Sequence, residues 1–199
     1  MRRPQHRVEG TPPAGRVRIA ALVGFALIVA VSGACAGPDV TLTPEVPALH
    51  PQVDAWPASV VTITPEPDRD GAAPEGADGT VRVDVRVADT DERRARGLMQ
   101  IAEVPEGSGM LFVFPSDHHG AFWMRDTLVP LDIAFARADG TIAAVLTMPV
   151  CEEDPCPLHH PGATYRVALE VPAGWFAAVG VEVGDRLHWT DPQPAGTAS

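Results

Sequence analysis

The sequence predicts a mainly β domain, a small closed or nearly closed β-barrel or sandwich with one or two short helices, preceded by a disordered spacer. Two observations lead to this fold class. Between residues 80 and 190, short segments of alternating or continuously apolar character are separated by turn residues, which is typical of barrels and sandwiches. Ahead of them, residues 36–79 are dominated by proline, glycine, alanine and acidic residues, so they bury too little apolar surface to offset the entropy of ordering.

The first elements of the domain follow from local patterns. Residues 81–87 alternate valine with arginine or aspartate, which predicts a half-buried strand. Asp89 is the expected N-cap of a short helix that runs through Arg96, with Gly97 at its C-terminal end. Residues 110–114 form a continuous apolar run that Pro115 stops, as expected for a strand buried on both faces.

The later elements complete the predicted sheet. Asp139 and Gly140 predict a tight turn between two of the strands. A short apolar patch at residues 59–63, inside the spacer, would add an edge strand. The remaining strands are expected at residues 121–124, 131–135, 141–148, 165–171, 181–183 and 186–189, with a short helix at 172–179 and a disordered tail at 191–199.

The N-terminal segment has the composition of a bacterial secretory signal. Five arginines precede an uncharged apolar run at residues 19–34, and small residues lead into Cys35. This end resembles the lipobox of bacterial lipoproteins, in which the cysteine is lipidated, although Ser32 stands where a large aliphatic residue is usual. We therefore expect residues 1–35 to be a signal segment with lipidation at Cys35. An ordinary cleaved signal and an uncleaved apolar anchor are the alternatives.

The charge of the chain limits its partners. Beyond residue 35 there are 10 arginines against 25 aspartates and glutamates, a net charge of −15. Such a protein does not bind nucleic acid by neutralising phosphates, and anionic lipid head groups repel it. The expected location is the cell envelope, with a membrane reached through the lipid on Cys35 or the uncleaved apolar run. Cleavage without lipidation would give a secreted protein.

Five sequence segments carry a family resemblance. They are GLM at residues 97–99, GMLFVFP at 109–115, FWMRDT at 122–127, PLDIAF at 130–135 and LEVPAGWF at 169–176. In this order and spacing they resemble the DUF192 family, also called UPF0127, over essentially the whole folded part. The resemblance implies a small β-rich domain, often behind a signal peptide, with no established activity. Asp126 replaces the asparagine usual in the family, so a donor and acceptor becomes a group that only accepts when ionised.

Two clusters invite a metal or redox interpretation. Cys151 and Cys156 are the only cysteines of the exported domain, and in an oxidising compartment we expect a disulfide between them. The following His159 and His160 make a metal site the alternative, and free thiols are a third. We expect neither a metal nor another cofactor. His118, with Asp117 and His119, would suit a general base or a metal ligand, but a solvated loop is the expected role.

Residues 122–127 form the most informative segment for function. Trp123 would stack on a polar ligand, Arg125 would grip a carboxylate or phosphate, and Asp126 and Thr127 would meet hydroxyl groups. The alternative is that Trp123 is core and Arg125 pairs with Asp126 or Glu170 to close a barrel end. The candidate ligand-binding residues are Trp123, Arg125, Asp126, Thr127, Asp132 and Glu170.

The sequence contains no nucleophile elbow, P-loop or dinucleotide fingerprint. The leading hypothesis is therefore a non-catalytic envelope module that binds a small polar ligand or a partner protein. One alternative is an envelope hydrolase that uses two of the carboxylates Asp126, Asp132 and Glu170, with help from His118. A purely structural partner of a membrane complex is the other.

Overall fold

The computed structural model describes residues 49–66 and 79–190, which belong to one compact unit of the chain, residues 42–199. The predicted signal segment with Cys35, the greater part of the spacer and the tail at 191–199 lie outside the described residues. Within the described ranges, none of the helices has the length and apolar character that crossing a membrane requires.

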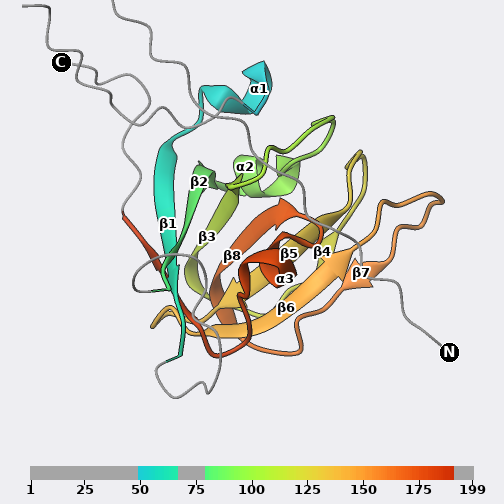
Figure 1. Cartoon of the computed structure of the whole chain (residues 1–199). Helices are drawn as coiled ribbons and strands as arrows, with labels where there is room; N and C mark the ends of the chain where they lie inside the picture. Colours follow the sequence, from blue (N-terminus) through green and yellow to red (C-terminus); the bar gives the residue numbers. More distant parts are fainter. Residues whose placement is uncertain (1–48, 67–78, 191–199) are drawn as a thin grey trace, which may run out of the picture. The chain divides into compact units, whose positions relative to one another are not determined.

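The domain is mainly β, as predicted. Figure 1 shows the strands curling around one another, with the short helices α1 and α2 at the upper end and α3 among the strands. In chain order the elements are α1 (Pro51–Asp54), β1 (Ala58–Thr64), β2 (Val81–Ala88), α2 (Asp91–Arg96), β3 (Ser108–His118), β4 (Phe122–Trp123), β5 (Leu131–Ala136), β6 (Ile142–Met148), β7 (Leu158–His159), β8 (Tyr165–Pro172), α3 (Trp175–Val179) and β9 (Arg186–Trp189).

Seven of the strands form one sheet in the order β6-β5-β8-β3-β2-β1-β9, and β4 pairs with β7 in a separate two-stranded sheet. The β2–β3 pair is parallel, whereas the other pairs are antiparallel. The two outer strands of the large sheet approach each other at one end, where a bridge joins Thr141 to Arg186 and the Leu187 N–H donates to the Gly140 carbonyl at 2.8 Å. The sheet is thus nearly closed, as the sequence predicts.

Gly140 makes this closure sterically feasible. Its φ is +87°, and a Cβ atom built on it would lie only 2.3 Å from the Leu187 carbonyl oxygen. Any larger residue would therefore meet both the cost of a left-handed backbone and a clash with the backbone of β9. The predicted Asp139–Gly140 turn has this additional role, which a pattern of local turn residues does not reveal.

The position of β1 corrects the prediction for the spacer. Residues 59–63 were expected at most to add an edge strand, but β1 pairs with β2 on one side and with β9 on the other. The reason is burial: Val61 and Ile63 are 0% and 1% exposed and join the interior of the curled sheet. Residues 49–66 therefore belong to the folded domain and not to a disordered spacer.

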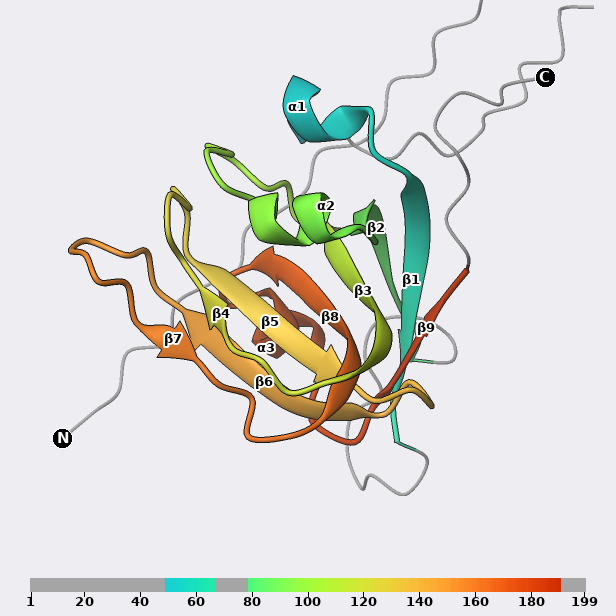
Figure 2. The ribbon, with the colours of Figure 1, turned by 180° about the vertical axis from the view of Figure 1, so that it is seen from behind.

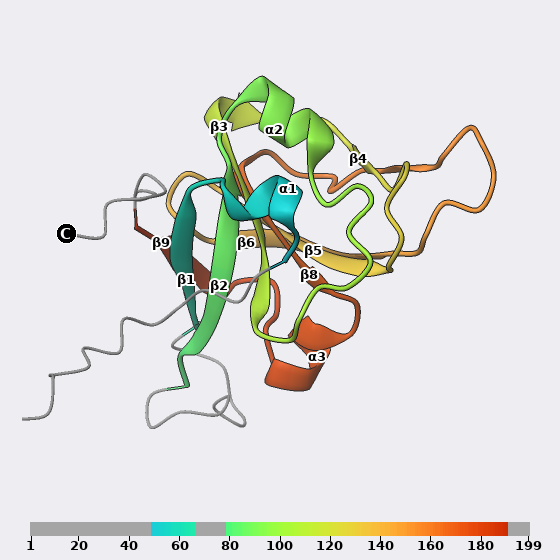
Figure 3. The same cartoon turned by 90° about the horizontal axis from the view of Figure 1, so that it is seen from above.

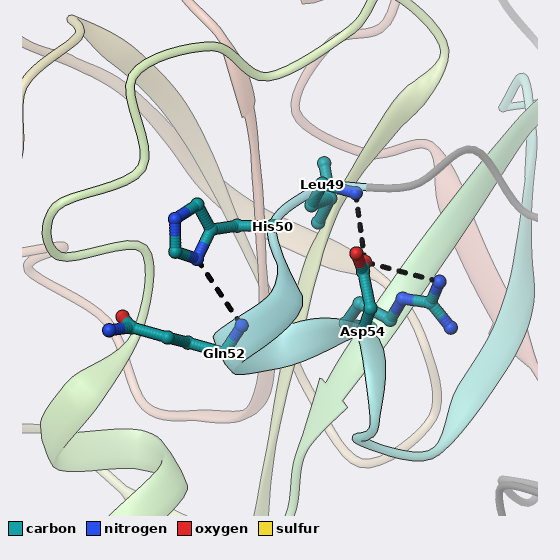
Figure 4. Close-up of polar contacts among 5 residues, drawn as sticks. Leu49, His50, Gln52 and Asp54 are labelled. Carbon is teal, nitrogen blue, oxygen red and sulfur yellow. Dashed lines mark hydrogen bonds and ion pairs between the residues drawn. The ribbon is translucent and has the colours of Figure 1, made fainter.

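The segment that leads into β1 is also fixed to the domain. The Asp54 carboxylate accepts from the Leu49 N–H at 2.9 Å, and Figure 4 shows this contact beside that of the Gln52 N–H with the His50 ring. Asp54 also forms an ion pair with Arg86 of β2 at 3.4 Å. Val53 of α1 is fully buried. These contacts attach α1 above the outer face of β2.

The side chains of the sheet divide between two hydrophobic cores. One core fills the inside of the curl and includes Val83, Leu111, Leu169 and Phe176 of α3. The other lies between the opposite face of the sheet and a cover that includes Val53 of α1, Leu98 and Ile101 of the turn after α2, and Phe122 of β4. Figure 3 shows α2 and α3 on opposite sides of strands β3 and β8. Because side chains alternate along a strand, neighbouring residues belong to different cores.

Several boundaries differ from the predicted ones. The N-cap of α2 is Thr90, whose hydroxyl accepts from the Arg93 N–H at 3.3 Å, so the expected cap at Asp89 is wrong by one position. Residues 181–183, expected as a strand, have no strand pairing. The two-residue strand β7 and the single turn α1 are too short to leave a periodic pattern in the sequence.

Candidate functional site

A narrow cleft lies between α2 with its following turn and β4 with the loop behind it. Its volume is about 30 Å³, which leaves room for roughly one water molecule. Aromatic and aliphatic side chains form most of its wall, with a buried carboxyl group, a hydroxyl and two arginines as its polar groups. The lining residues are Arg94, Ala95, Arg96, Gly97, Leu98, Met99, Phe112, Phe122, Trp123, Thr127 and Glu170.

Glu170 is the buried carboxyl group of this cleft. It lies on β8 between Met110 of β3 and Ile133 of β5 in the register of the sheet, and it is 4% exposed. Among the described residues, no hydrogen bond or ion pair reaches its carboxyl group. Burial raises the pKa of Glu170 to about 8, because the ionised form loses its hydration. At neutral pH the side chain is therefore mostly the neutral acid, which can donate a hydrogen bond.

Two arginines of α2 line the cleft with different degrees of pairing. Arg94 donates to the Val113 carbonyl at 2.7 Å and pairs with Asp91. Arg96 contacts the side-chain oxygen of Gln52, but its Nε is buried without a hydrogen-bond partner among the described residues. Neither arginine was among the site residues predicted from the sequence. The GLM motif that follows them was the one sequence signal pointing to this wall.

The Trp123–Thr127 segment forms the outer edge of the cleft. In the β4–β7 pair, Phe122 faces the second core while Trp123 faces outward and is 45% exposed. The Arg125 guanidinium lies 5.6 Å from the centre of the Trp123 ring, in cation–π contact. Its side chain is 54% exposed, and its ion pair with Asp126 is long, at 3.9 Å. Trp123 is thus not a core residue, and Arg125 does not pair with Glu170.

The backbone of this segment is held in an unusual conformation. Asp126 has a φ of +55°, and its carbonyl accepts from the N–H of Gln100, which itself has a φ of +62°. The Asp126 side chain is 61% exposed and does not line the cleft. Thr127 is buried and lines the cleft, and its hydroxyl donates to the Arg125 carbonyl at 3.4 Å. The tight turn therefore presents Arg125 and Asp126 outward while Thr127 faces in.

Asp132 occupies the opposite face of the sheet from Glu170. It shares the face of Ala134, which belongs to the interior core, and its carboxylate accepts from the Thr147 hydroxyl at 2.7 Å and from the Gly174 N–H at 2.8 Å. These bonds give Asp132 a structural role at the start of α3. The three carboxylates proposed for hydrolysis are therefore separated: one is outside the cleft, one lies inside it, and one is on the other face.

His118 is not in a solvated loop. Its ring stacks on Phe114 with 4.4 Å between centroids and meets the Tyr165 ring edge to face. Burial lowers the pKa of His118, and the nearby charges of His119 and Arg94 lower it further. The Tyr165 hydroxyl donates to the Gly120 carbonyl at 3.0 Å, and burial raises its pKa. This aromatic cluster has a packing role at the end of β3.

A disulfide joins Cys151 to Cys156, with the two Cα atoms 5.5 Å apart. The acidic loop between them leads into β7, which Figure 2 shows next to β4 at one side of the sheet. In the part of the chain that the structure describes, His, Cys, Asp and Glu side chains nowhere gather in a group of three that would hold a metal ion.

A second hollow, of about 290 Å³, shares no lining residue with the cleft. It is lined by Asp117, Arg137, Ala138, Asp139, Thr164 and Tyr165, and Asp117 forms an ion pair with Arg166 at 2.9 Å. The exposed apolar surface lies elsewhere: Trp123 and its cross-strand partner Leu158 are 45% and 59% exposed. The two side chains extend the edge of the cleft with an apolar patch.

Comparisons with known proteins place this geometry in context. A search of curated proteins gave no match. A solved structure of a protein of unknown function from Novosphingobium aromaticivorans DSM 12444 is 27% identical, with a TM-score of 0.60, and the match covers 73% of this chain and 94% of that one. A protein from Sinorhizobium meliloti 1021, described as a proposed transcription regulator, is 27% identical with a TM-score of 0.58, covering 68% of this chain and 95% of that one.

A family model confirms the family resemblance noted in the sequence. A family model for DUF192, described as an uncharacterized ACR, covers residues 73–189. That range contains the cleft, the Trp123–Thr127 segment and every strand except β1. The chain belongs to the DUF192 family of uncharacterized proteins.

Proposed function

We propose that this protein is a non-catalytic envelope module that binds a small molecule carrying a carboxylate and hydroxyl groups at the Trp123–Thr127 segment. One observation carries the proposal: Trp123 and Arg125 are both about half exposed and lie in contact at the edge of a cleft. An exposed tryptophan offers a stacking surface, and an arginine without a close ion partner offers two parallel donors to a carboxylate.

The charges around the cleft support an anionic ligand, although the protein as a whole is strongly acidic. Three arginines lie at or beside the cleft: Arg94, Arg96 and Arg125. The one carboxyl group in its lining, Glu170, is mostly neutral at pH 7. Arg94 pairs with Asp91 and Arg125 makes a long ion pair with Asp126, so Arg96 is the arginine of this set without a carboxylate partner in the described structure. This one excess positive charge supports binding of an anion at the cleft.

Two other functions, hydrolysis by paired carboxylates and DNA binding, have less support. A hydrolase with paired carboxylates needs two of them facing one substrate, and here only Glu170 faces the cleft. DNA binding, which the description of the Sinorhizobium relative would imply, finds no support in a chain with a net charge of −15 beyond residue 35. The location in the envelope rests on the signal-like segment and Cys35.

To test the proposal, D-glucuronate is titrated into the full-length chain in detergent, and binding is measured from the NMR signals of the tryptophan indole N–H groups. D-glucose is the neutral comparison. We expect D-glucuronate to bind and D-glucose to bind at least tenfold more weakly. Arg125→Gln and Trp123→Ala should each weaken binding of D-glucuronate about tenfold, as expected for loss of a charge-assisted or stacking contact.

Arg137→Gln is the matched control, because Arg137 is an exposed arginine that lines the second hollow instead of the cleft. It should leave the affinity unchanged. Loss of binding in Arg137→Gln with normal binding in Arg125→Gln would move the site to the second hollow. Absence of binding by D-glucuronate, D-galacturonate and lactate at millimolar concentration would reject the ligand class.

A further inference from the structure

The second hollow, of about 290 Å³, lies where the pairing of β3 with β8 is irregular. From Val113 to His118 the chain of β3 advances by five positions, whereas β8 advances by only two, from Val167 to Tyr165. The additional residues of β3 leave the ladder as a bulge, and a bulge bends its strand and redirects its side chains. Asp117 belongs to this bulge and lines one side of the hollow.

Two further segments complete the lining. In the large sheet β8 lies between β3 and β5, and its first residue, Tyr165, lines the hollow together with the preceding Thr164. The turn that follows β5 contributes the other side, with Arg137, Ala138 and Asp139. The hollow is therefore formed by three segments that meet at one end of the sheet.

Asp117 keeps one carboxylate oxygen available. Arg166 of β8 donates from Nε and Nη2 at 3.2 and 2.9 Å, and both of these hydrogen bonds reach the same oxygen, Oδ1. Within the described residues, no hydrogen bond reaches Oδ2. An ionised carboxylate accepts several hydrogen bonds, so Oδ2 can accept from a donor in the hollow.

Arg137 and Asp139 supply two opposite charges on the other side of the hollow. Hydrogen bonds from Thr141 and, to a smaller extent, nearby arginine charges that include Arg137 lower the pKa of Asp139, so this carboxylate is ionised at neutral pH. In the described part of the chain, no hydrogen bond or ion pair reaches the Arg137 guanidinium. Its N–H groups are therefore available to an acceptor in the hollow.

The charges of the lining indicate the class of ligand. An anion would be attracted by Arg137 but repelled by Asp117 and Asp139, and a cation would meet the reverse combination. A molecule that carries both charges finds a partner for each of them. The volume is close to the lower limit of roughly 300 Å³ for ligand pockets, which suits a small molecule.

We propose that the second hollow binds a small zwitterion that carries an ammonium group and a carboxylate. The Arg137 guanidinium donates to the carboxylate, and Asp117 accepts from the ammonium group through Oδ2, with Asp139 adding to the attraction. This site shares no lining residue with the cleft and takes a different class of ligand, so the inference is independent of the proposed function.

Tyr165 provides a reporter at the hollow, because it is the only tyrosine of the chain. The full-length chain in detergent, labelled with isotopes at tyrosine alone, is titrated with glycine, β-alanine, 4-aminobutyrate and 5-aminovalerate, in which the two charged groups lie progressively further apart. We expect at least one of these amino acids to shift the tyrosine NMR signals saturably. Its analogue without the ammonium group and its analogue without the carboxylate should each bind at least tenfold more weakly. For 4-aminobutyrate, these analogues are butyrate and propylamine.

Variants of the two charged walls test the assignment of roles. Arg137→Gln and Asp117→Asn should each weaken binding of the amino acid about tenfold, because each removes one charged contact. The matched controls are Arg82→Gln and Asp89→Asn, which change an exposed arginine and an exposed aspartate outside the hollow and should leave the affinity unchanged.

Three results would each overturn the inference. They are tyrosine signals that none of the amino acids shifts, an analogue with one charge that binds as tightly as its amino acid, and unchanged binding in both Arg137→Gln and Asp117→Asn. The proposed function is measured separately, from the tryptophan signals in the presence of D-glucuronate. Failure at the hollow therefore leaves the proposed function standing, and failure at the cleft leaves the zwitterion site standing.

Discussion

Glu170 and Asp132 are buried carboxyl groups on the neighbouring strands β8 and β5, and they differ in their hydrogen-bond partners. Asp132 accepts hydrogen bonds from the Thr147 hydroxyl and the Gly174 N–H. Glu170 has no such donors within the described structure, and burial raises its pKa to about 8. Asp132 therefore stabilises the fold through its two hydrogen bonds, whereas Glu170 is mostly the neutral acid at neutral pH.

The first prediction concerns the pH dependence of stability. Glu170 has a higher pKa in the folded state than in the unfolded state, so between about pH 4.5 and pH 8 the folded chain binds the extra proton. The stabilisation is complete below the unfolded pKa and is lost as the pH rises through the folded one, at up to about 1.4 kcal/mol per pH unit. Relative to Glu170→Gln, the wild type should thus lose free energy of unfolding from pH 5 to pH 8. Urea denaturation at each pH measures it.

Other carboxylates titrate in the same range, so the difference between the two proteins is the meaningful quantity. Glu103→Gln, at an exposed position, should give a curve parallel to that of the wild type. Parallel curves for Glu170→Gln and the wild type would mean that Glu170 is ionised in the folded protein at neutral pH.

The second prediction concerns Gly140, where β9 closes the sheet. Gly140→Ala should destabilise the fold by about 3 kcal/mol, because it adds a clash with the Leu187 carbonyl to the cost of a positive φ. Gly162→Ala is the matched control, since Gly162 has a φ of +67° but no atom within 4 Å of the added carbon. It should cost about 1 kcal/mol. Equal shifts of the denaturation midpoint would show that the closure contributes nothing at this position.

At the residue scale, only some features of the candidate site can be predicted from the sequence. Trp123 and Arg125 lie at the surface and Glu170 is buried, and their role in ligand binding stays a prediction. The separation of Asp132 from Glu170 follows from strand alternation once β5 and β8 are known to be neighbours, with Ile133 opposite Glu170. That pairing is a long-range fact, and no local pattern in the sequence specifies it.

At the scale of elements, β1 is the part of the fold that differs most from expectation. It lies before the residues matched by the family model, yet it joins β2 to β9 and covers the interior of the curl with Val61 and Ile63. Its apolar residues alternate as expected for a strand. The residues on both sides are acidic and rich in proline, so the composition of the whole segment predicts disorder. The strands β2 and β8, with eight residues each against seven in β1, were predicted because their alternation extends over more residues.

The third prediction follows from this position. A fragment of residues 79–190 lacks β1, so β2 and β9 lose their common partner and the interior core loses its cover. We expect no cooperative thermal unfolding from this fragment alone. A peptide of residues 49–66 added in excess should restore it, because it supplies the missing strand by backbone pairing. Near-UV circular dichroism during heating measures the effect.

The control peptide carries Val61→Asp and Ile63→Asp, which place two charges against the interior core. It should fail to restore cooperative unfolding, because a buried unpaired charge costs more than the strand pairing contributes. A fragment that unfolds cooperatively without any peptide would show that the domain folds without β1.

The fourth prediction separates structural from binding carboxylates. Asp132→Ala removes the acceptor that connects β5 to Thr147 of β6 and to the backbone at the start of α3, and it should cost about 2–4 kcal/mol in urea denaturation. Thr147→Val removes one of these two bonds and should cost about 1 kcal/mol. Neither change should alter binding of D-glucuronate, since Asp132 lies on the face opposite the cleft. Loss of binding in the folded Asp132 variant would revive a joint role for the carboxylates.

At the scale of the whole molecule, the net charge bears on how the protein would reach the membrane in its expected location. The net charge of −15 beyond residue 35 makes attachment by surface charge unfavourable at an anionic membrane. A domain held at the envelope then needs another means of attachment. The cysteine that follows the apolar run at residues 19–34 would provide it through a lipid.

The last prediction tests this attachment in the full-length protein. The wild type expressed in a bacterial host should be recovered in the membrane fraction, with an intact mass that begins at Cys35 and includes a lipid. Cys35→Ser should move the protein to the soluble exported fraction or leave the signal segment uncut, because serine offers no thiol for lipidation. The variant still contains Cys151 and Cys156, so the disulfide serves as an internal control for exposure to an oxidising compartment. A wild-type protein found in the cytosol with its first 34 residues present and both cysteines reduced would remove the envelope role, while the cleft and its ligand would remain open to the binding tests above.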